Sequence, residues 1–284
     1  MPMKLTTNSE HACFGGTVGF YEHHSESCDA NMRFAVYTPP QAASGPVPVL
    51  YYLAGLTSTE ETFMIKGGAQ RAAAEHGLML VSPDTSPRDL NLLGEDDAYD
   101  FGTGAGFYID ATLEPWSHHY KMYTYVTSEL PAIITEHFPA RADSAGIFGH
   151  SMGGHGALTL ALKNPDFYRS VSAFAPIAAP TRVPWGKKAF SGYLGPDEEQ
   201  WRDHDATELV KEHPFPDGRT ILVDGGTADE FLEEQLSPGV FEAACAEVGQ
   251  PLEFRRREGY DHGYYFISTF IDDHIRHHAG ILNA

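Results

Sequence analysis

The pattern Gly149-His150-Ser151-Met152-Gly153 constrains the possible fold more than any other part of this 284-residue chain. The apolar segment Ala145–Phe148 before it is typical of a buried strand, and Met152–Lys163 after it has the apolar spacing of a helix. In this context a G-x-S-x-G pattern predicts a sharp, strained turn that raises the serine hydroxyl above the sheet edge. Glycine is expected at both ends because side chains there would collide, and Gly154 and Gly156 would let the helix pack tightly. The alternative is a glycine-rich helix start with an incidental serine.

Short apolar runs alternate with segments of helical period along the chain. The predicted strands are Arg33–Thr38, Val47–Ala54, Leu78–Pro83, Ala145–Phe148, Ser170–Ala175, Thr220–Val223 and Leu252–Arg256. The predicted helices are Phe63–His76, Met122–His137, Met152–Lys163, Phe231–Val248 and Gly263–His278. This alternation predicts an α/β fold, with a mostly parallel sheet and helices on both faces. The strands before Leu78 lack an intervening helix and are expected to form an antiparallel edge. No repeat or linker divides the chain, so residues 1–284 are expected to form one domain.

Two long segments fit neither a strand nor a helix. Asp84–Ser117 is rich in glycine and aspartate, and Ala178–Gln200 is rich in proline, glycine and aromatic residues. Irregular segments of this length in a compact domain are usually functional. We therefore expect them to form walls of an active site.

The formal net charge of −20 argues against nucleic acid and anionic membranes as partners, because a negative surface repels phosphates. The sequence has no stretch of about 18 apolar residues that could span a bilayer, and its N-terminus does not read as a secretory signal. Its three cysteines, Cys13, Cys28 and Cys245, are too few for a disulfide framework. They indicate reduced, idle thiols and a cytoplasmic location.

A serine hydroxyl is a weak nucleophile near neutral pH, so Ser151 needs a base and the base needs an orienting carboxylate. In this fold class the order along the chain is Ser, acid, His. Among fifteen histidines, His262 lies in a loop between the final predicted strand and helix. The spacing of His274, His277 and His278 could bind a metal, but no cysteine or acidic loop joins them. We expect them to be a solvated helix end that complements the helix dipole.

For the acid, the strand ending at Val223 is followed by two candidates. Asp224 is close to the strand and could cap its end, whereas Asp229 lies in the following loop, where a triad must assemble. We choose Asp229, with Asp224 as support behind it and Glu230 as the weaker alternative.

An oxyanion hole needs two backbone N–H groups aimed at the developing negative charge. One is expected from Met152, the residue after the nucleophile. The other is expected from Leu56, in the turn Gly55-Leu56-Thr57-Ser58 that ends the predicted strand Val47–Ala54. An ordinary strand-ending turn is the alternative for that segment.

With these residues placed, the chain resembles the S-formylglutathione hydrolases, the esterase D family, over nearly its whole length. The resemblance rests on seven blocks: Tyr52–Thr57, Ser82–Arg88, Gly94–Asp97, Asp100–Tyr108, Gly149–Gly156, Pro184–Phe190 and Glu258–His262. Several of these blocks fall in the two irregular segments that composition had marked.

The resemblance implies an α/β-hydrolase fold, no cofactor and no metal. It implies a triad of Ser151, Asp229 and His262, with oxyanion amides from Leu56 and Met152. The implied reaction is hydrolysis of the thioester S-formylglutathione to glutathione and formate, in formaldehyde detoxification, through a formyl-enzyme. Members are often dimeric, so a homodimer is compatible with the resemblance.

Three positions depart from the family pattern. Many members have cysteine at the position of Ser58, a thiol that can modulate activity, so this sensitivity should be absent here. Tyr99 replaces a tryptophan of the family, and Asp89 stands where glycine commonly follows Arg88.

The resemblance in the loops around Asp97 and Trp185 implies that the substrate is a small acyl thioester. Because glutathione is anionic and the chain is acidic, a local basic patch is needed, and Lys187 and Lys188 beside Trp185 are the candidates. Two solvated surface lysines are the alternative. The competing functions are a broad short-chain carboxylesterase, an acyltransferase acting on a sugar, and a noncatalytic binding protein on a hydrolase scaffold.

Overall fold

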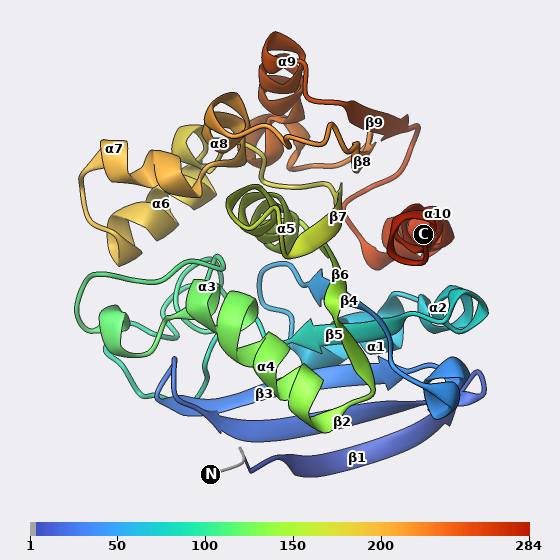
Figure 1. Ribbon diagram of the computed structural model, residues 1–284. Coiled ribbons are helices and arrows are strands. Elements are labelled where there is room, and N and C mark those ends of the chain that lie inside the picture. Colours follow the sequence, from blue (N-terminus) through green and yellow to red (C-terminus); the bar gives the residue numbers. More distant parts are fainter. Residues whose placement is uncertain (1–3) are drawn as a thin grey trace.

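A nine-stranded sheet organises the chain in the computed structural model, which describes residues 4–284 (Figure 1). Its strands are β1 (Thr6–Cys13), β2 (Gly16–Ser25), β3 (Ala30–Thr38), β4 (Val47–Leu53), β5 (Met79–Pro83), β6 (Ala140–His150), β7 (Tyr168–Phe174), β8 (Ile221–Gly226) and β9 (Leu252–Arg257). They are ordered β1-β2-β3-β5-β4-β6-β7-β8-β9.

The sheet is parallel from β5 to β9, and β1, β2 and β3 form an antiparallel edge that joins it through β5. This confirms the predicted mostly parallel α/β sheet. The expectation for the strands before Leu78 is right for β3 but wrong for β4, which lies between β5 and β6 and is parallel to both. Every residue of β4 is buried, so its continuous apolar run is that of a central strand.

The helices cover both faces of the sheet (Figure 1). They are α1 (Glu60–Lys66), α2 (Gln70–His76), α3 (Met122–Thr124), α4 (Leu130–His137), α5 (Met152–Lys163), α6 (Pro184–Tyr193), α7 (Glu198–Trp201), α8 (Ala206–Glu212), α9 (Pro238–Val248) and α10 (Tyr264–Leu282). On one face α5 packs on β4, β6 and β7, and on the other α10 packs on β6, β7 and β8. None of the helices in residues 4–284 is long and apolar enough to cross a membrane.

Two of the predicted helices are interrupted. The segment predicted as Phe63–His76 is two helices, α1 and α2, because Gly67 and Gly68 separate them and Gly68 has a φ of 73°. The segment predicted as Phe231–Val248 is a π-helical turn followed by α9, with Ser237 at a φ of 46° between them. The segment predicted as Met122–His137 is continuous, with a π-helical turn between α3 and α4.

The irregular character predicted for Ala178–Gln200 is wrong, since α6 and most of α7 lie within it. Pro184 occupies the first turn of α6, where its missing N–H costs nothing, and Trp185, Phe190 and Tyr193 bury one side of the helix. By contrast, Asp84–Ser117 has only two isolated β-bridges and the start of a short 3-10 turn, so it is irregular as predicted.

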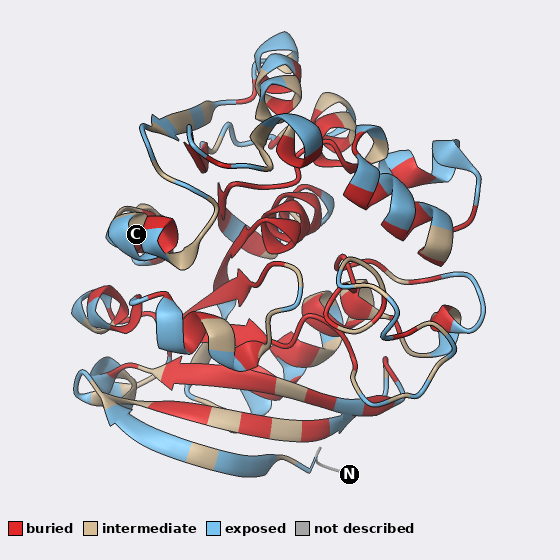
Figure 2. Ribbon diagram, turned by 180° about the vertical axis from the view of Figure 1, so that it is seen from behind, coloured by how far each residue is buried: buried red, intermediate tan, exposed pale blue. Residues whose placement is uncertain are grey.

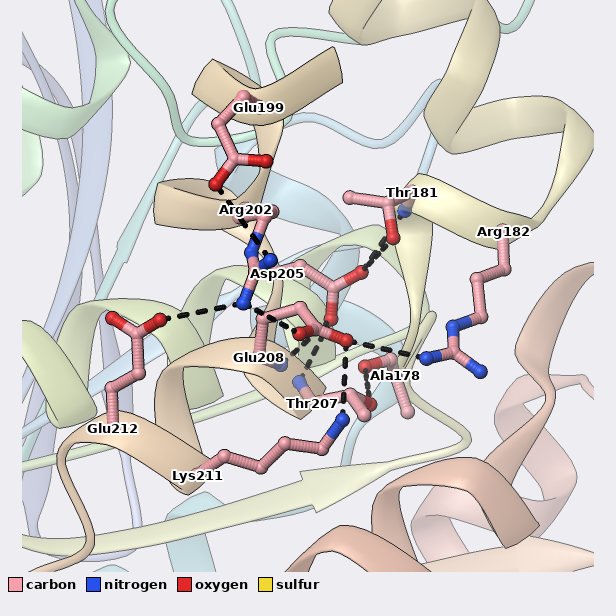
Figure 3. Close-up of polar contacts among 10 residues, drawn as sticks. All are labelled: Ala178, Thr181, Arg182, Glu199, Arg202, Asp205, Thr207, Glu208, Lys211 and Glu212. Atoms are coloured by element: carbon pink, nitrogen blue, oxygen red, sulfur yellow. Dashed lines mark hydrogen bonds and ion pairs between the residues drawn. The ribbon is translucent and has the colours of Figure 1, made fainter.

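The sequence did not predict β1, β2 or α8. In Figure 2, β1 is mostly exposed, and its residues are largely polar, so the apolar alternation of a half-buried strand is missing. Asp205 caps the N-terminus of helix α8; its side chain is fully buried and accepts hydrogen bonds from the amides of Thr207 (2.8 Å) and Glu208 (3.4 Å). Asp205 also binds Thr181, which fastens the chain between β7 and α6 to α8 (Figure 3).

The histidines of α10 are not a solvated helix end. His274 and His278 are fully buried, and His278 lies between the hydroxyls of Ser170 (2.6 Å) and Ser172 (2.8 Å). His274 Nδ1 also bonds the Ser172 hydroxyl (2.8 Å). The predicted exposure was wrong because these side chains project from α10 onto β7, where serines supply their partners.

Burial makes this cluster sensitive to acid. It lowers the pKa of His278 well below 6.5, and the nearby His277 and His274 add to the shift. Below pH 6.5 the unfolded chain therefore binds a proton that the folded chain resists, so stability falls as the pH falls. We expect His278→Gln to cost about 1–3 kcal/mol at pH 7.5, and to lose less further stability than the parent between pH 7.5 and pH 5.

Urea unfolding at both pH values measures this effect, and the exposed His76→Gln variant is the control. An equal acid-induced loss in the parent and in His278→Gln would contradict the assignment.

Candidate active site

The turn between β6 and α5 places Ser151 in an uncommon backbone conformation, with φ 57° and ψ −117°. Three hydrogen bonds hold it: the Ser151 amide donates to Phe174 (3.0 Å), and its carbonyl accepts from His155 (3.0 Å) and Ile177 (3.2 Å). The structure confirms the predicted sharp, strained strand-to-helix turn, and bonds from three directions stabilise a conformation that L-residues rarely adopt.

Two glycines of the motif are required by close backbone approach. A Cβ on Gly153 would overlap the carbonyl oxygen of Leu53, and one on Gly149 would overlap the carbonyl of Gly153. Gly154 and Gly156 lie against Pro176 and Tyr108, where an added Cβ would come within 2.9 Å and 2.6 Å. The start of α5 therefore contacts the end of β4 directly, as the expected collisions at 149 and 153 had indicated.

His262 and Asp229 lie together at the carboxyl end of the sheet. His262 follows β9, Asp229 follows β8, and the distance from His262 Nδ1 to Asp229 Oδ2 is 2.6 Å. The Asp229 side chain is fully buried, and its other oxygen accepts from the Phe231 amide at 2.9 Å. Because a carboxylate only accepts, this bond places the proton on Nδ1 and leaves Nε2 able to accept one.

Ser151 and His262 line the same cavity, which has a volume of about 240 Å³. The turn 55–58 forms one wall, and the aromatic side chains of Tyr99, Trp185, Phe231 and Tyr264 form much of the rest. A larger cavity of about 400 Å³ lies between β8, β9 and the start of α9. Its lining includes no serine–histidine pair, so the smaller cavity is the candidate active site.

Of the two residues expected to supply oxyanion amides, Leu56 lines this cavity, and Met152 directly follows Ser151, which also lines it. Met152 is the first residue of α5, where an N–H has no partner within the helix. In the turn 55–58, the Ser58 amide bonds the Gly55 carbonyl at 3.3 Å. That bond closes the turn without using the Leu56 N–H.

Some predicted residues lie elsewhere. Asp97 is exposed and absent from the cavity lining, and its amide bonds Gly94 within a turn (3.4 Å). Lys187 and Lys188 are also exposed and outside the lining, and Lys188 forms an ion pair with Asp100. Trp185, by contrast, lines the cavity.

The alternative acids also lie apart from His262. Asp224 is fully buried, accepts from Arg257 Nε at 2.8 Å, and lies 3.7 Å from His274 Nε2. These contacts join β8 to β9 and α10. They do not include Asp229, so the expected support of the triad acid by Asp224 is not seen. Glu230 is exposed.

Sequence reasoning missed His150 and Phe231 as neighbours of His262. Their ring centroids lie 4.5 Å and 5.0 Å from that of His262, and both rings line the cavity. Burial, followed by the proximity of His262, lowers the pKa of His150 well below 6.5, so His150 is neutral beside it. The only available signal was that His150 precedes Ser151 in the motif.

The family departures are accommodated locally. Tyr99 Oη accepts a hydrogen bond from Trp185 Nε1 at 3.2 Å, which joins two cavity walls. Asp89 has a φ of 61°, a conformation that favours glycine but that aspartate tolerates better than most residues. Among residues 4–284, no group of three or more His, Cys, Asp or Glu side chains is arranged to hold a metal ion.

Comparisons with known proteins agree on one family. A family model described as "Esterase: Putative esterase" matches residues 25–277. The chain is 58% identical to the S-formylglutathione hydrolase of Rattus norvegicus and 59% identical to that of Mus musculus, covering 99% of this chain and 100% of each relative. A solved S-formylglutathione hydrolase from Agrobacterium tumefaciens is 50% identical with a TM-score of 0.93, over 98% of this chain and 99% of that one.

Substitution of glycine tests the close approach of α5 and β4. We expect Gly153→Ala to lower the free energy of unfolding by at least about 3 kcal/mol. The added Cβ would overlap the carbonyl oxygen and carbon of Leu53, which are buried backbone atoms that cannot easily move. The matched control is Gly280→Ala in α10, where nothing lies within 4 Å of the added Cβ, so stability should rise by up to about 1 kcal/mol. Chemical denaturation of both variants measures this, and equal effects would refute the packing argument.

Proposed function

Since the chain belongs to the esterase family, among its S-formylglutathione hydrolases, we propose that it hydrolyses S-formylglutathione to glutathione and formate. The observation that carries the proposal is the placement of Ser151 and the hydrogen-bonded pair His262–Asp229 at one cavity. A noncatalytic scaffold has no need to maintain a strained serine beside an oriented histidine.

The proposed nucleophile is Ser151. Its hydroxyl attacks the thioester carbonyl while His262 Nε2 takes the proton, and Asp229 stabilises the imidazolium that forms. The carbonyl–sulfur bond then breaks and the imidazolium gives its proton to the leaving sulfur, which leaves formyl-Ser151, free glutathione and neutral His262. Water, deprotonated by His262, releases formate and restores the serine. Since a thiol is a better leaving group than an amine, protonation of the leaving group matters less here than in a protease.

Leu56 and Met152 are proposed to donate their amides to the oxyanion. The contact between Gly153 and Leu53 supports this role, because it brings the end of β4 to the start of α5. Leu56 follows Leu53 by three residues, and Met152 immediately precedes Gly153. Fixed donors at the site of developing charge stabilise the transition state without reorganisation.

For the substrate, we propose that Trp185 and its neighbour Tyr99 form a wall against which the acyl thioester binds. A small acyl group suits a restricted cavity, since bulkier groups would clash rather than lose contacts. The positive charge for anionic glutathione is proposed to come from Lys187, with Lys188 already balanced by Asp100. Asp97 lies outside the cavity lining, so we propose that it affects substrate binding only through the conformation of its loop.

The wider biological setting is also a proposal. We infer a single domain acting in the cytoplasm without a cofactor, with no nucleic-acid or membrane partner, and compatible with a homodimer. The acidic net charge of −20 and the three free thiols support this setting. Gel filtration with light scattering would test the dimer, and a monomer at micromolar concentration would exclude it.

The nucleophile is tested by substitution. Ser151→Ala should lower kcat for S-formylglutathione by about 10⁴-fold or more, because the covalent route is lost. The exposed Ser268→Ala on α10 is the matched control and should retain full activity. Steady-state kinetics with both variants measures this. Retention of a tenth of the activity by Ser151→Ala would refute the assignment.

The substrate is tested by comparing kcat/KM for S-formylglutathione and for p-nitrophenyl acetate. We expect the thioester to be preferred by about 100-fold, the range that differential contacts in one pocket can supply. A preference for the aryl ester would favour the broad carboxylesterase. Lys187→Gln should raise KM for the thioester and leave the neutral ester unaffected, whereas equal effects would remove the lysine from the site.

A further inference from the structure

The turn 55–58 holds a residue in an unfavourable conformation. Thr57 has a φ of 66°, although it is neither glycine nor asparagine. It occupies the third position of a turn closed by the Ser58 amide and the Gly55 carbonyl, at 3.3 Å. A β-branched residue at positive φ is strained, so contacts outside the turn must maintain this shape.

Two side chains from one neighbouring segment bind the last carbonyl of the turn. Thr85 Oγ1 donates to the Ser58 carbonyl at 2.6 Å, and Arg88 Nη2 donates to the same oxygen at 3.0 Å. Thr85 is fully buried, so its hydroxyl does not exchange this partner freely for water.

Asp84 fixes both donors. Its buried carboxylate binds Arg88 through Nε (2.7 Å) and Nη2 (2.8 Å), and it accepts from the Thr85 amide at 2.7 Å. A guanidinium held at two points cannot rotate away from the Ser58 carbonyl without breaking a charge-assisted pair.

The turn is also held from its other side. The Thr57 amide donates to the Gly104 carbonyl at 2.9 Å, and the Gly104 amide donates to Ser86 Oγ at 2.8 Å. Gly104 has a φ of 76°, and a Cβ on it would come within 3.0 Å of Thr57 Cα. The segment 84–88 thus holds the turn directly at Ser58 and, through Gly104, at Thr57.

We propose that Thr85 and Arg88 are positioning residues that hold the strained turn 55–58 so that the Leu56 amide points at the forming oxyanion. The inference rests on the proposed function, because the oxyanion role of Leu56 is part of it. Neither side chain lines the cavity. They act through the Ser58 carbonyl, which lies two residues after Leu56, and therefore affect the transition state more than substrate binding.

Thr85→Val keeps the shape of the side chain and removes the donor. We expect it to lower kcat for S-formylglutathione by about ten- to 100-fold, less than deletion of a whole oxyanion donor, with KM within about twofold. Thr85→Ser restores a hydroxyl and should recover most of the rate. Arg88→Lys keeps the charge beside Asp84 but cannot make all of the arginine contacts, so it should lower kcat in the same way. Arg88→Lys also provides an independent variant if Thr85→Val does not fold.

Two further readouts separate positioning from general destabilisation. The Ki of phenylboronic acid, which places a tetrahedral oxygen in the oxyanion hole, should rise in Thr85→Val in parallel with the loss of kcat. The Kd of the product glutathione should not change. In addition, the factor by which Thr85→Val lowers kcat should be smaller in a Thr57→Gly background. Glycine at position 57 relieves the backbone strain that Thr85 and Arg88 oppose.

Repeating the kinetics with p-nitrophenyl acetate separates a failure of the proposed substrate from a failure of the positioning role, because both substrates form an oxyanion. If the parent hydrolyses the ester but not the thioester, and Thr85→Val and Arg88→Lys lower kcat for the ester, the proposed substrate fails and the positioning role stands. If the parent hydrolyses the thioester and Thr85→Val and Arg88→Lys leave kcat unchanged, the positioning role fails. A rise in KM without loss of kcat, or a Thr85→Ser variant as slow as Thr85→Val, would equally overturn it.

Discussion

The backbone contact between Gly153 and Leu53 is the constraint on which the site depends. Because Gly153 has no side chain, the first turn of α5 reaches the carbonyl at the end of β4. That contact brings two segments far apart in the sequence to one point at the sheet edge: the turn after Leu53 and the turn containing Ser151. The proposed nucleophile and both proposed oxyanion amides therefore derive their placement from one close approach. The parallel sheet then adds Asp229 and His262 from the ends of β8 and β9, since carboxyl ends of parallel strands share an edge.

The irregular segment 84–117 is a scaffold for this site as well as a wall beside it. Its Thr85 and Arg88 donate to the carbonyl of Ser58, Asp84 holds Arg88 in place, and the Gly104 carbonyl accepts from the amide of Thr57. An exposed loop would leave a strained turn free to relax, whereas buried polar partners hold it in a single shape. This explains how a long segment without helix or strand can keep a defined conformation beside a reactive serine.

The sequence predicted the elements that carry strong local patterns. The turn at Ser151, α5 and the parallel strands follow from apolar runs and glycine spacing, and Asp229 and His262 were chosen from their positions after predicted strands. What failed depended on tertiary contacts. β1 lacks apolar alternation because it is an exposed edge, and α6 was hidden by Pro184, Gly186 and Gly192, which fit its surroundings. His274 and His278 read as solvated because nothing in α10 reveals that Ser170 and Ser172 lie opposite them.

The central claim is that the reaction passes through a formyl group on Ser151. Rapid acid quenching of the parent enzyme during turnover of saturating S-formylglutathione, followed by peptide mass spectrometry, tests it most directly. The account predicts a mass increase of one formyl group on the peptide containing Ser151, and none on the same peptide of Ser151→Ala. Turnover by the parent with the formyl group on Cys13, Cys28 or Cys245, or with no covalent adduct on Ser151 at any quench time, would contradict the account.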